Sequence, residues 1–327
     1  SSYGSGRATV SAYQIFNDGW TRVGTSNVWR RPYSGAYSGA GPVVGNVIDL
    51  SRTMESPAGD VLGWQNLEEE GDKVGVFRNN PAVLPFGKYA YDWAREVMYV
   101  NVGANPNDRS LGISCVGRFV NTPLGASPTN VAIHNLHIIG FARASINIQG
   151  DSTNWHIHDN DFYAIGGMYN VPSKWYHGSG IQMTHNANNI EINNNTLVQT
   201  FDSPITPQHF GGSSNGHMHD LHFHDNYIDR WALGAVEMAD FGTNNRFSRV
   251  TIEDNTAING GLGFSSIGDT PQGVTDGFQV RGGNSSVFSD LVIRRNKVNT
   301  AHANVVIGGS NFTNAILVED NTLWGAD

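Results

Sequence analysis

Short runs in which apolar and polar residues alternate recur through the second half of the chain, and most of them end in Asn. In each run the second and fourth residues are apolar and the third is usually polar, which is the period of a β-strand with one buried face. The runs are Asn154–Asn160, Asn189–Asn195, Asp220–Asn226, Arg249–Asn255, Asp290–Asn296 and Ala315–Asn321, with a degenerate first copy at Asn130–Leu136. No window sustains a 3.6-residue period, so a helical solenoid is excluded.

The spacing of these runs indicates stacked supersecondary units. Leu136 to Asn160 is 24 residues and Asn296 to Asn321 is 25, within the range of solenoid repeats. A second apolar strand falls in each period, at Ser145–Gln149, Gly180–Thr184, Pro204–Gln208, Ala235–Ala239, Gly277–Arg281 and Asn304–Gly308. We expect an all-β coil in which the repeated Asn takes left-handed backbone angles and bonds its neighbour one coil away as a ladder.

Through its I-x-I-x-x-N coils and G-I-x-I strands the sequence resembles right-handed parallel β-helices of the pectate-lyase-like superfamily. The resemblance covers residues 130–327. Residues 1–129 are less regular and resemble an N-terminal lead-in of coils and loops, so that the whole chain is expected to form one continuous domain. The superfamily includes polysaccharide lyases, glycoside hydrolases, uronan epimerases and phage tailspike depolymerases, so the fold alone does not choose an activity.

Composition narrows the class of partner. The chain has 327 residues, 39% of them hydrophobic, and a formal net charge of −9 with its 20 basic residues scattered, so nucleic acid is not an expected partner. No apolar run approaches the length of a membrane span, and Cys115 is the only cysteine, which excludes an intrachain disulfide. The resemblance implies an extracellular protein or one on a virion surface. Both chain ends lack a cap in the sequence. We therefore expect either that flanking domains have been removed, or that an end is covered by the lead-in segment or by another subunit, in a monomer or a homotrimer.

Aligning the second strands on their first apolar residue defines the face where chemistry is expected. Ile146, Ile181, Ile205, Val236, Phe278 and Val305 then form one interior column. The outward rows read Asn147, Gln182, Thr206, Glu237, Gln279 and then Gln149, Thr184, Gln208, Ala239, Arg281, with His185, His209 and Asp240 at the strand ends. A purely structural β-helix also carries such rows, because stacked amides and hydroxyls pair along a ladder. The convergence of acids, imidazoles and an arginine on neighbouring coils favours a sugar-binding groove instead.

Two long insertions precede the same strand and are expected to border this groove. They are Tyr163 to Gly178 and Gly260 to Asp276, and the first brings Trp175 and Tyr176 to the rim. Aromatic rings on loops cover the apolar faces of sugars, although the same rings also serve simply to pin down a long loop. The predicted substrate-binding residues are His185, Arg281, Gln182, Gln208, Trp175 and Tyr176.

Hydrolysis of a glycosidic bond requires two carboxyl groups, one protonated and one ionised. Glu237 and Asp240 are the leading pair, Asp202 is the third candidate, and His209 is the candidate base or orienting residue. Elimination from a uronate instead needs a base such as His209 or Tyr176, and a cation such as Arg281. We expect no cofactor and no metal, because no ligand spacing accompanies the histidine row. His156, His158, His222 and His224 are interpreted as surface histidines on the outward face of the first strand.

Three functions therefore remain open from the sequence. The first is a glycoside hydrolase acting on an extracellular polysaccharide or oligosaccharide. The second is a polysaccharide lyase or uronan epimerase that uses His, Arg and Tyr. The third is a non-catalytic glycan-binding module, fibre or tailspike.

Overall fold

The structure is a computed structural model that describes part of the chain. The described residues are 6–34, 36–38, 41–43, 45–51, 60–61, 63–64, 83–92, 95–123, 125–170, 175–210, 212, 214–262, 275–283, 285–300, 302–309 and 311–325. Within them the regular structure is almost entirely strand, and a 3-10 turn lies at Pro106–Asp108. Across the same residues no helix is long and apolar enough to cross a membrane.

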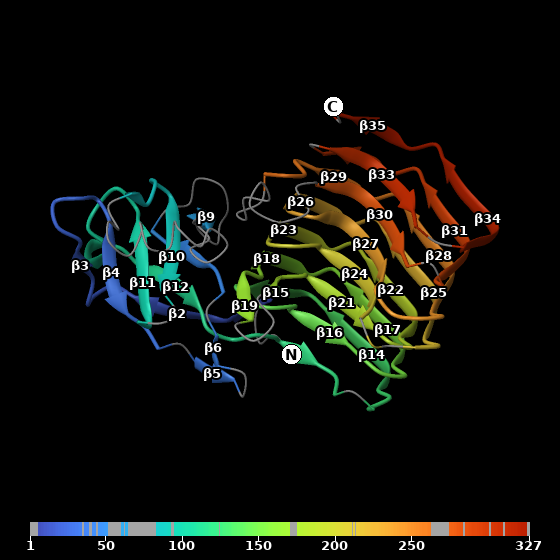
Figure 1. The fold of residues 1–327 in the computed structure, drawn as a ribbon, viewed down its shortest axis with the longest axis horizontal. Helices are drawn as coiled ribbons and strands as arrows, with labels where there is room; N and C mark the ends of the chain where they lie inside the picture. Colours follow the sequence, from blue (N-terminus) through green and yellow to red (C-terminus); the bar gives the residue numbers. More distant parts are fainter. Residues whose placement is uncertain are drawn as a thin grey trace.

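Three parallel sheets make up the region from residue 120 onward, and the chain visits them in a fixed cyclic order (Figure 1). Sheet 1 contains β14 (Thr129–His134), β17 (Thr153–His158), β22 (Asn188–Asn193), β25 (His217–His224), β28 (Arg246–Glu253), β31 (Val287–Arg294) and β34 (Asn311–Glu319). Sheet 2 contains β1 (Ala8–Ser11), β15 (Leu136–Ile139), β18 (Asp161–Ile165), β23 (Thr196–Thr200), β26 (Tyr227–Trp231), β29 (Thr256–Ile258), β32 (Lys297–Asn299) and β35 (Thr322–Trp324). Sheet 3 contains β13 (Val120–Asn121), β16 (Ile146–Ile148), β21 (Ile181–Thr184), β24 (Ile205–His209), β27 (Gly234–Asp240), β30 (Asp276–Gly282) and β33 (Ala303–Gly308).

This arrangement confirms an almost all-β protein with long parallel sheets, and it is compatible with the predicted parallel β-helix. Each repeated run forms a strand of sheet 1, and each second apolar strand forms a strand of sheet 3. The predicted interior column is also confirmed, because successive strands of sheet 3 pair Ile146 with Ile181, Ile205, Val236, Phe278 and Val305 in turn. All but Val305 are fully buried. The apolar alternation read from the sequence therefore sets the register.

The Asn ladder lies at the corner between sheets 1 and 2. Asn160 donates from its backbone and its side chain to Asn195 Oδ1, both at 3.1 Å, and Asn195 makes the same two bonds to Asn226. The ladder continues through Asn255 and Asn296 to Asn321. Stacked amides thus satisfy buried polar groups that the corner would otherwise leave unpaired.

The expected backbone angle of these Asn residues was wrong by one position. The left-handed residue is the one before each ladder Asn, with φ between 53° and 57° at Asn135, Asp159, Asn194, Asp225, Asp254, Arg295 and Asp320. The turn is made there, so that the next side chain is free to point inward to the ladder. Arg295 shows that the ladder bonds hold this conformation even where the residue type does not favour it.

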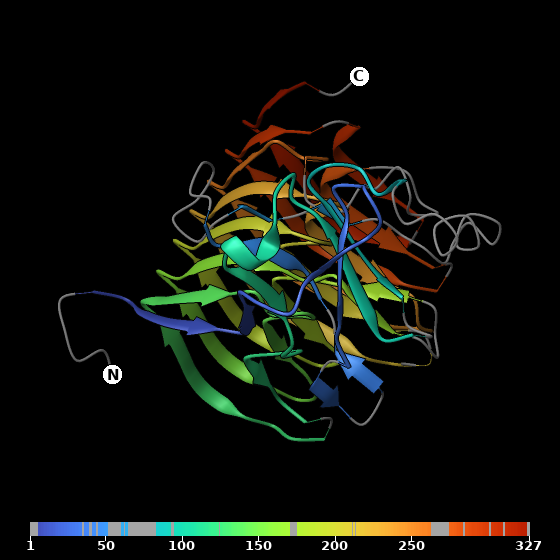
Figure 2. The same cartoon turned by 90° about the vertical axis from the view of Figure 1, so that its left-hand side faces the viewer.

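The N-terminal region packs beside the coils as two small, mainly antiparallel sheets (Figures 1 and 2). One joins β3 (Thr21–Arg22), β4 (Trp29–Pro32), β11 (Val97–Asn101), β10 (Lys88–Asp92) and β9 (Gly63–Trp64), and the other joins β2 (Tyr13–Phe16), β12 (Leu111–Ser114), β7 (Val47–Asp49) and β8 (Asp60–Val61). Two hairpins complete the described strands, β5 (Ala36–Ser38) with β6 (Gly41–Val43), and β19 (Met168–Asn170) with β20 (Trp175–His177).

Contacts tie this region to the corner where sheet 2 leads into sheet 3. Phe201 of the coils packs in the aromatic core of the N-terminal region. Asn46, fully buried, donates to the carbonyl oxygens of Ala164 and Gly166 at 2.8 and 2.9 Å. The N-terminal region thereby lies next to the start of the sheet 3 strands. The division into a lead-in of residues 1–129 and regular coils of residues 130–327, within one continuous domain, stays a prediction.

Candidate functional site

The strand register of sheet 3 brings the predicted outward residues side by side, and the middle of the first row is buried. The strand register places Asn147 beside Gln182, Gln182 beside Thr206, and Glu237 beside Gln279. Although these side chains point away from the apolar core, Thr206, Glu237 and Gln279 are at most 2% exposed. An ionisable group in such a row loses most of its contact with water, which disfavours its charged form.

Glu237 is the centre of a polar cluster on β24 and β27. Its Oε2 accepts hydrogen bonds from Ser203 Oγ at 3.1 Å, Thr206 Oγ1 at 3.4 Å and Gln208 Nε2 at 2.8 Å. Burial raises the pKa of Glu237, and the bond from Ser203 and the charge of Arg281 oppose this shift. Among the described residues, all three of these donors converge on the same oxygen of Glu237.

Asp202 lies one coil before Glu237 and is coupled to it electrostatically. Its backbone carbonyl accepts from the amides of Ala232 and Leu233, at 3.2 and 3.3 Å, just ahead of β27. Burial raises the pKa of Asp202 to about 8, and the charge of Glu237 adds to the shift. The carboxyl nevertheless belongs to a residue that is only partly buried. The raised pKa favours the protonated form of the Asp202 carboxyl at neutral pH.

A third acid, Asp276, was missed by the sequence analysis. It is 1% exposed, pairs with Gly234 in the strand register, and binds Arg281 NH2 through Oδ2 at 3.3 Å. Its Oδ1 lies 2.8 Å from His302 Nδ1, and Gln279 also donates to Oδ2. The signal was present in the sequence, because extending the strand alignment two residues upstream puts Asp276 in the row of Gly234.

Gly234 borders this cluster. A Cβ built at Gly234 would approach Glu237 Cβ at 3.4 Å and Gln279 Cβ at 3.6 Å. Ser203 Oγ also accepts a hydrogen bond from the Gly234 amide at 3.3 Å. Gly234 therefore lies beside Glu237 of its own strand and beside its register partner Asp276 on the next strand.

His209 and Asp240 form a second group at the far end of the same strands. They are register partners, and His209 is fully buried. Burial lowers the pKa of His209 to about 4, against the opposing charge of Asp240. Asp240 Oδ1 accepts from Gly242 N at 2.7 Å and Asn245 Nδ2 at 2.8 Å. Asp240 thus stabilises the turn that follows its own strand. The lowered pKa of His209 favours a neutral imidazole inside the coil.

The predicted binding residues divide between these two groups. Gln182 donates to Gln208 at 3.4 Å, and Gln208 donates to Glu237, which forms one amide relay toward the carboxyl. His185, in a left-handed conformation with φ of 65°, lies close enough to lower the pKa of His209. The side chains of Trp175 and Tyr176 lie outside the described part of the structure.

Comparison with known proteins gives no family. No family model matches the sequence, and no curated protein matches it. A solved structure described as "The complex structure of XylC with xylose" aligns with a TM-score of 0.45 and 11% identity, over 94% of this chain and 59% of that one. Another, described as "Glycoside hydrolase", aligns with a TM-score of 0.36 and 8% identity, over 98% of this chain and 83% of that one. At these scores neither alignment decides the activity of this chain.

Proposed function

We propose that this chain hydrolyses glycosidic bonds of an extracellular polysaccharide or oligosaccharide, at the cluster around Asp202 and Glu237. One observation carries the proposal: the buried Glu237 carboxyl accepts a hydrogen bond at 3.1 Å from Ser203, the residue next to Asp202, so that two acids from adjacent coils meet in one polar cluster. Burial and the charge of Glu237 also raise the pKa of Asp202. Glycosidases use a pair of this kind, in which one acid is protonated and the other ionised. The proposed pair is thus Asp202 with Glu237, in place of Glu237 with Asp240.

The surroundings assign a role to each member. Asp202, protonated at neutral pH and partly exposed, is the proposed general acid that donates to the leaving oxygen. Glu237 is the proposed ionised partner, since three hydrogen-bond donors and the charge of Arg281 favour its carboxylate. Two interacting acids share their titration, so loss of the first proton from the pair favours retention of the second.

The remaining parts of the proposal follow from the same cluster. Amide and hydroxyl groups of the sheet 3 rows supply partners for sugar hydroxyls. The chain passes through the three parallel sheets in a repeating order, and we propose that these coils wind as a right-handed parallel β-helix. A crossover between parallel strands is almost always right-handed. An extracellular or virion-surface location and a monomeric or homotrimeric state belong to the same proposal.

Release of reducing ends from a panel of neutral and uronate-containing polysaccharides tests this function. We expect release without the ultraviolet absorbance of an unsaturated product. Asp202→Asn should lower kcat by about 10² or more, while Asp151→Asn, an exposed matched control, should leave it unchanged. An unsaturated product would replace the hydrolase with a lyase. Saturable glycan binding without any bond cleavage would instead make the chain a binding module.

The pH dependence follows from the raised pKa of Asp202. Because the acid must be protonated, kcat should fall as the pH rises through about 8, and then tenfold per unit. The folded-state pKa also lies above that of an unfolded aspartate, so the group stabilises the fold at acid pH, and this contribution is lost as the pH rises toward 8. An activity that stays constant up to pH 9 would contradict the role of Asp202.

A lyase remains the second candidate because of Arg281 and His302. Arg281 has a partly exposed guanidinium, and His302 is more than half exposed, both beside Asp276. An arginine can neutralise a uronate carboxylate while an imidazole removes the C5 proton. Hydrolysis is preferred since Arg281 is already paired with Asp276. Loss of activity in His302→Ala with retained activity in Asp202→Asn would favour the lyase.

A further inference from the structure

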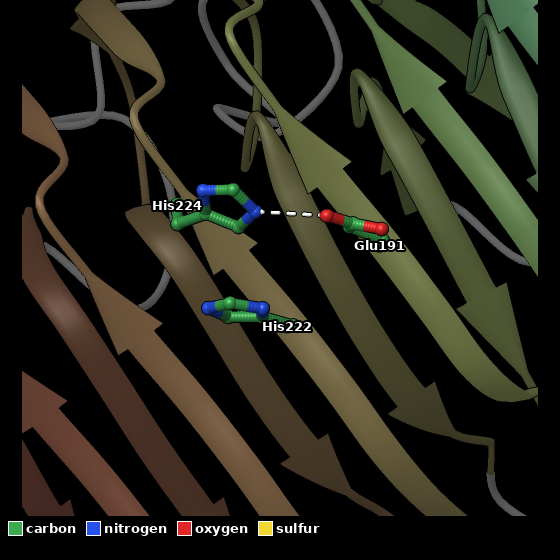
Figure 3. Close-up of side chains that lie close together, drawn as sticks. All are labelled: Glu191, His222 and His224. Carbon is green, nitrogen blue, oxygen red and sulfur yellow. Dashed lines mark hydrogen bonds and ion pairs between the residues drawn. The ribbon is translucent and has the colours of Figure 1, made fainter.

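Three side chains gather on the outward face of sheet 1 (Figure 3). The proposed active site lies on another sheet, sheet 3. Glu191 projects from β22, and His222 and His224 project from the adjacent strand β25. Residues two apart on a strand share a face, so both imidazoles lie on the side of Glu191. Their potential ligand atoms all lie within 4.8 Å of one another.

His224 is oriented as a metal ligand usually is. Its Nε2 lies 3.1 Å from Glu191 Oε1, and its Nδ1 lies 2.8 Å from Asp225 Oδ2. Ligating histidines commonly donate their second ring N–H to a carboxylate, which fixes the tautomer and the ring direction. Asp225 fills that place here, so Nε2 is directed at Glu191.

His222 is oriented by a different carboxylate. Its Nε2 lies 2.8 Å from Glu253 Oε1, and Glu253 Oε2 accepts from Arg294 Nε at 2.6 Å and Arg295 NH2 at 2.7 Å. Glu253 thus contacts His222 Nε2 and both arginines through its two oxygens. Because Glu253 occupies Nε2, we assign Nδ1 as the ligand atom of His222.

We propose that Glu191, His222 and His224 bind a divalent transition metal of the zinc class. Two imidazoles and one carboxylate suit zinc and its neighbours, whereas calcium and magnesium prefer oxygen ligands. Bonds of about 2.1 Å in a tetrahedron separate ligand atoms by about 3.4 Å. The Glu191–His224 pair already meets this spacing at 3.1 Å. The His222 ring is stacked on His224 with ring centroids 4.1 Å apart, so it must turn toward the ion when the metal binds.

The three side chains are partly exposed, so an ion from solution can reach them. The side chains of Glu191, His222 and His224 are 45%, 40% and 17% exposed, so one coordination position faces solvent. The bound ion would replace the hydrogen bond between β22 and β25 with three metal–ligand bonds that join the two strands. A metal that binds only the folded state raises the free energy of unfolding. This site revises the sequence-based expectation of surface histidines without a metal.

Calorimetric titration of the full chain, stripped with a chelator and titrated with Zn²⁺, tests the proposal. We expect one saturable site per chain, confirmed by the visible spectrum of bound Co²⁺. His222→Ala and His224→Ala should each lower affinity by about 10- to 100-fold or more, and Asp225→Asn by about 10-fold. His219→Ala, on the same strand but outside the set, should bind Zn²⁺ as the wild type does.

Thermal unfolding separates metal binding from misfolding. Zn²⁺ should raise the Tm of the wild type and of His219→Ala, and it should leave the Tm of the His222→Ala, His224→Ala double variant unchanged. Circular dichroism without metal should be the same for all variants. Absence of saturable Zn²⁺ binding to the wild type, or equal binding by the double variant, would overturn the proposal. Neither result bears on the hydrolase proposal, whose residues lie on sheet 3.

Discussion

The outward faces of sheets 1 and 3 have the same repeat, the same alternation and a similar polar composition, yet they differ in exposure. On sheet 3, Thr206 and Glu237 are 0% and 2% exposed. On sheet 1, the side chains of His156, Glu191 and His222 are 40% to 45% exposed. Both faces point away from the same apolar core. The difference therefore lies in what surrounds each face, which strand alternation does not encode.

Exposure decides which physical effect sets the charge of each group. On sheet 3 desolvation dominates, raising the pKa of Asp202 and Glu237 and lowering that of His209. On sheet 1 a hydrogen bond from His224 dominates at Glu191 and lowers its pKa. The pKa shifts therefore favour protonated carboxyls and a neutral imidazole on sheet 3. On sheet 1 the lowered pKa of Glu191 favours its carboxylate.

The largest expected effect is on turnover, from Glu237→Gln. The amide keeps the shape and accepts hydrogen bonds from Ser203 and Gln208, but it cannot ionise or exchange a proton. We expect kcat to fall by about 10² or more with folding intact. Steady-state kinetics with circular dichroism checks this result.

Glu319→Gln is the matched control for this substitution, because Glu319 is an acid on sheet 1 outside both proposed sites. It should retain wild-type turnover. Near-native turnover of Glu237→Gln would show that the sheet 3 cluster is not catalytic. Burial of this face would then have no link to activity.

Acid stability provides the second test. His209 is buried, its pKa is lowered to about 4 by burial, and the groups that act on its charge are Asp240, His185 and His217. A base with a depressed folded-state pKa stabilises the fold above its unfolded pKa, and this contribution is lost as the pH falls toward 4. The loss amounts to about 3 kcal/mol at most, since one pKa unit corresponds to about 1.4 kcal/mol.

Denaturation midpoints at pH 7, 5.5 and 4 measure this loss, with His209→Gln as the comparison. The variant should lose less stability than the wild type between pH 6.5 and 4, because glutamine does not titrate. Equal losses in both proteins would show that protonation of His209 does not lower the free energy of unfolding, as expected if water reaches the imidazole.

Features that depend on residues close together in the sequence were predicted better than features that depend on distant residues. Val236 and Ile205 became register partners as the alternation predicted, because strand period and apolar burial are local and strong signals. The same alignment placed Glu237 correctly. It did not show that Asp202 is coupled to Glu237, because that depends on the shape of the corner before the strand.

Longer-range features escaped prediction for the same reason. Asp276 and His302 meet only because consecutive coils bring the starts of β30 and β33 together. Asn46 reaches the coils from a part of the chain without repeats. Side-chain pairs joined across insertions of unequal length leave no fixed spacing in the sequence.

The Asn ladder gives the third prediction, a loss of about 1 to 3 kcal/mol in the free energy of unfolding for Asn226→Ala. Asn226 accepts from Asn195 N and Nδ2, and it donates to Asn255 Oδ1 and to the carbonyl oxygen of Ile192. Alanine leaves these buried partners unpaired. Urea denaturation measures the effect, with exposed Lys297→Ala as a control that should stay within about 0.5 kcal/mol. An unchanged midpoint for Asn226→Ala would mean that water replaces the ladder bonds.

The smallest expected effect is for His156→Ala on the exposed face. His156 is 41% exposed and bonds the side chain of Asn193 at 2.6 Å, and water can replace that partner when the imidazole is removed. The free energy of unfolding should therefore change by less than about 0.5 kcal/mol. Thr206→Ala, at an outward but fully buried position of sheet 3, should cost more, because Thr206 is a hydrogen-bond donor to the buried Glu237 carboxylate. If urea denaturation gave the two variants equal losses, exposure would not be what separates the two faces.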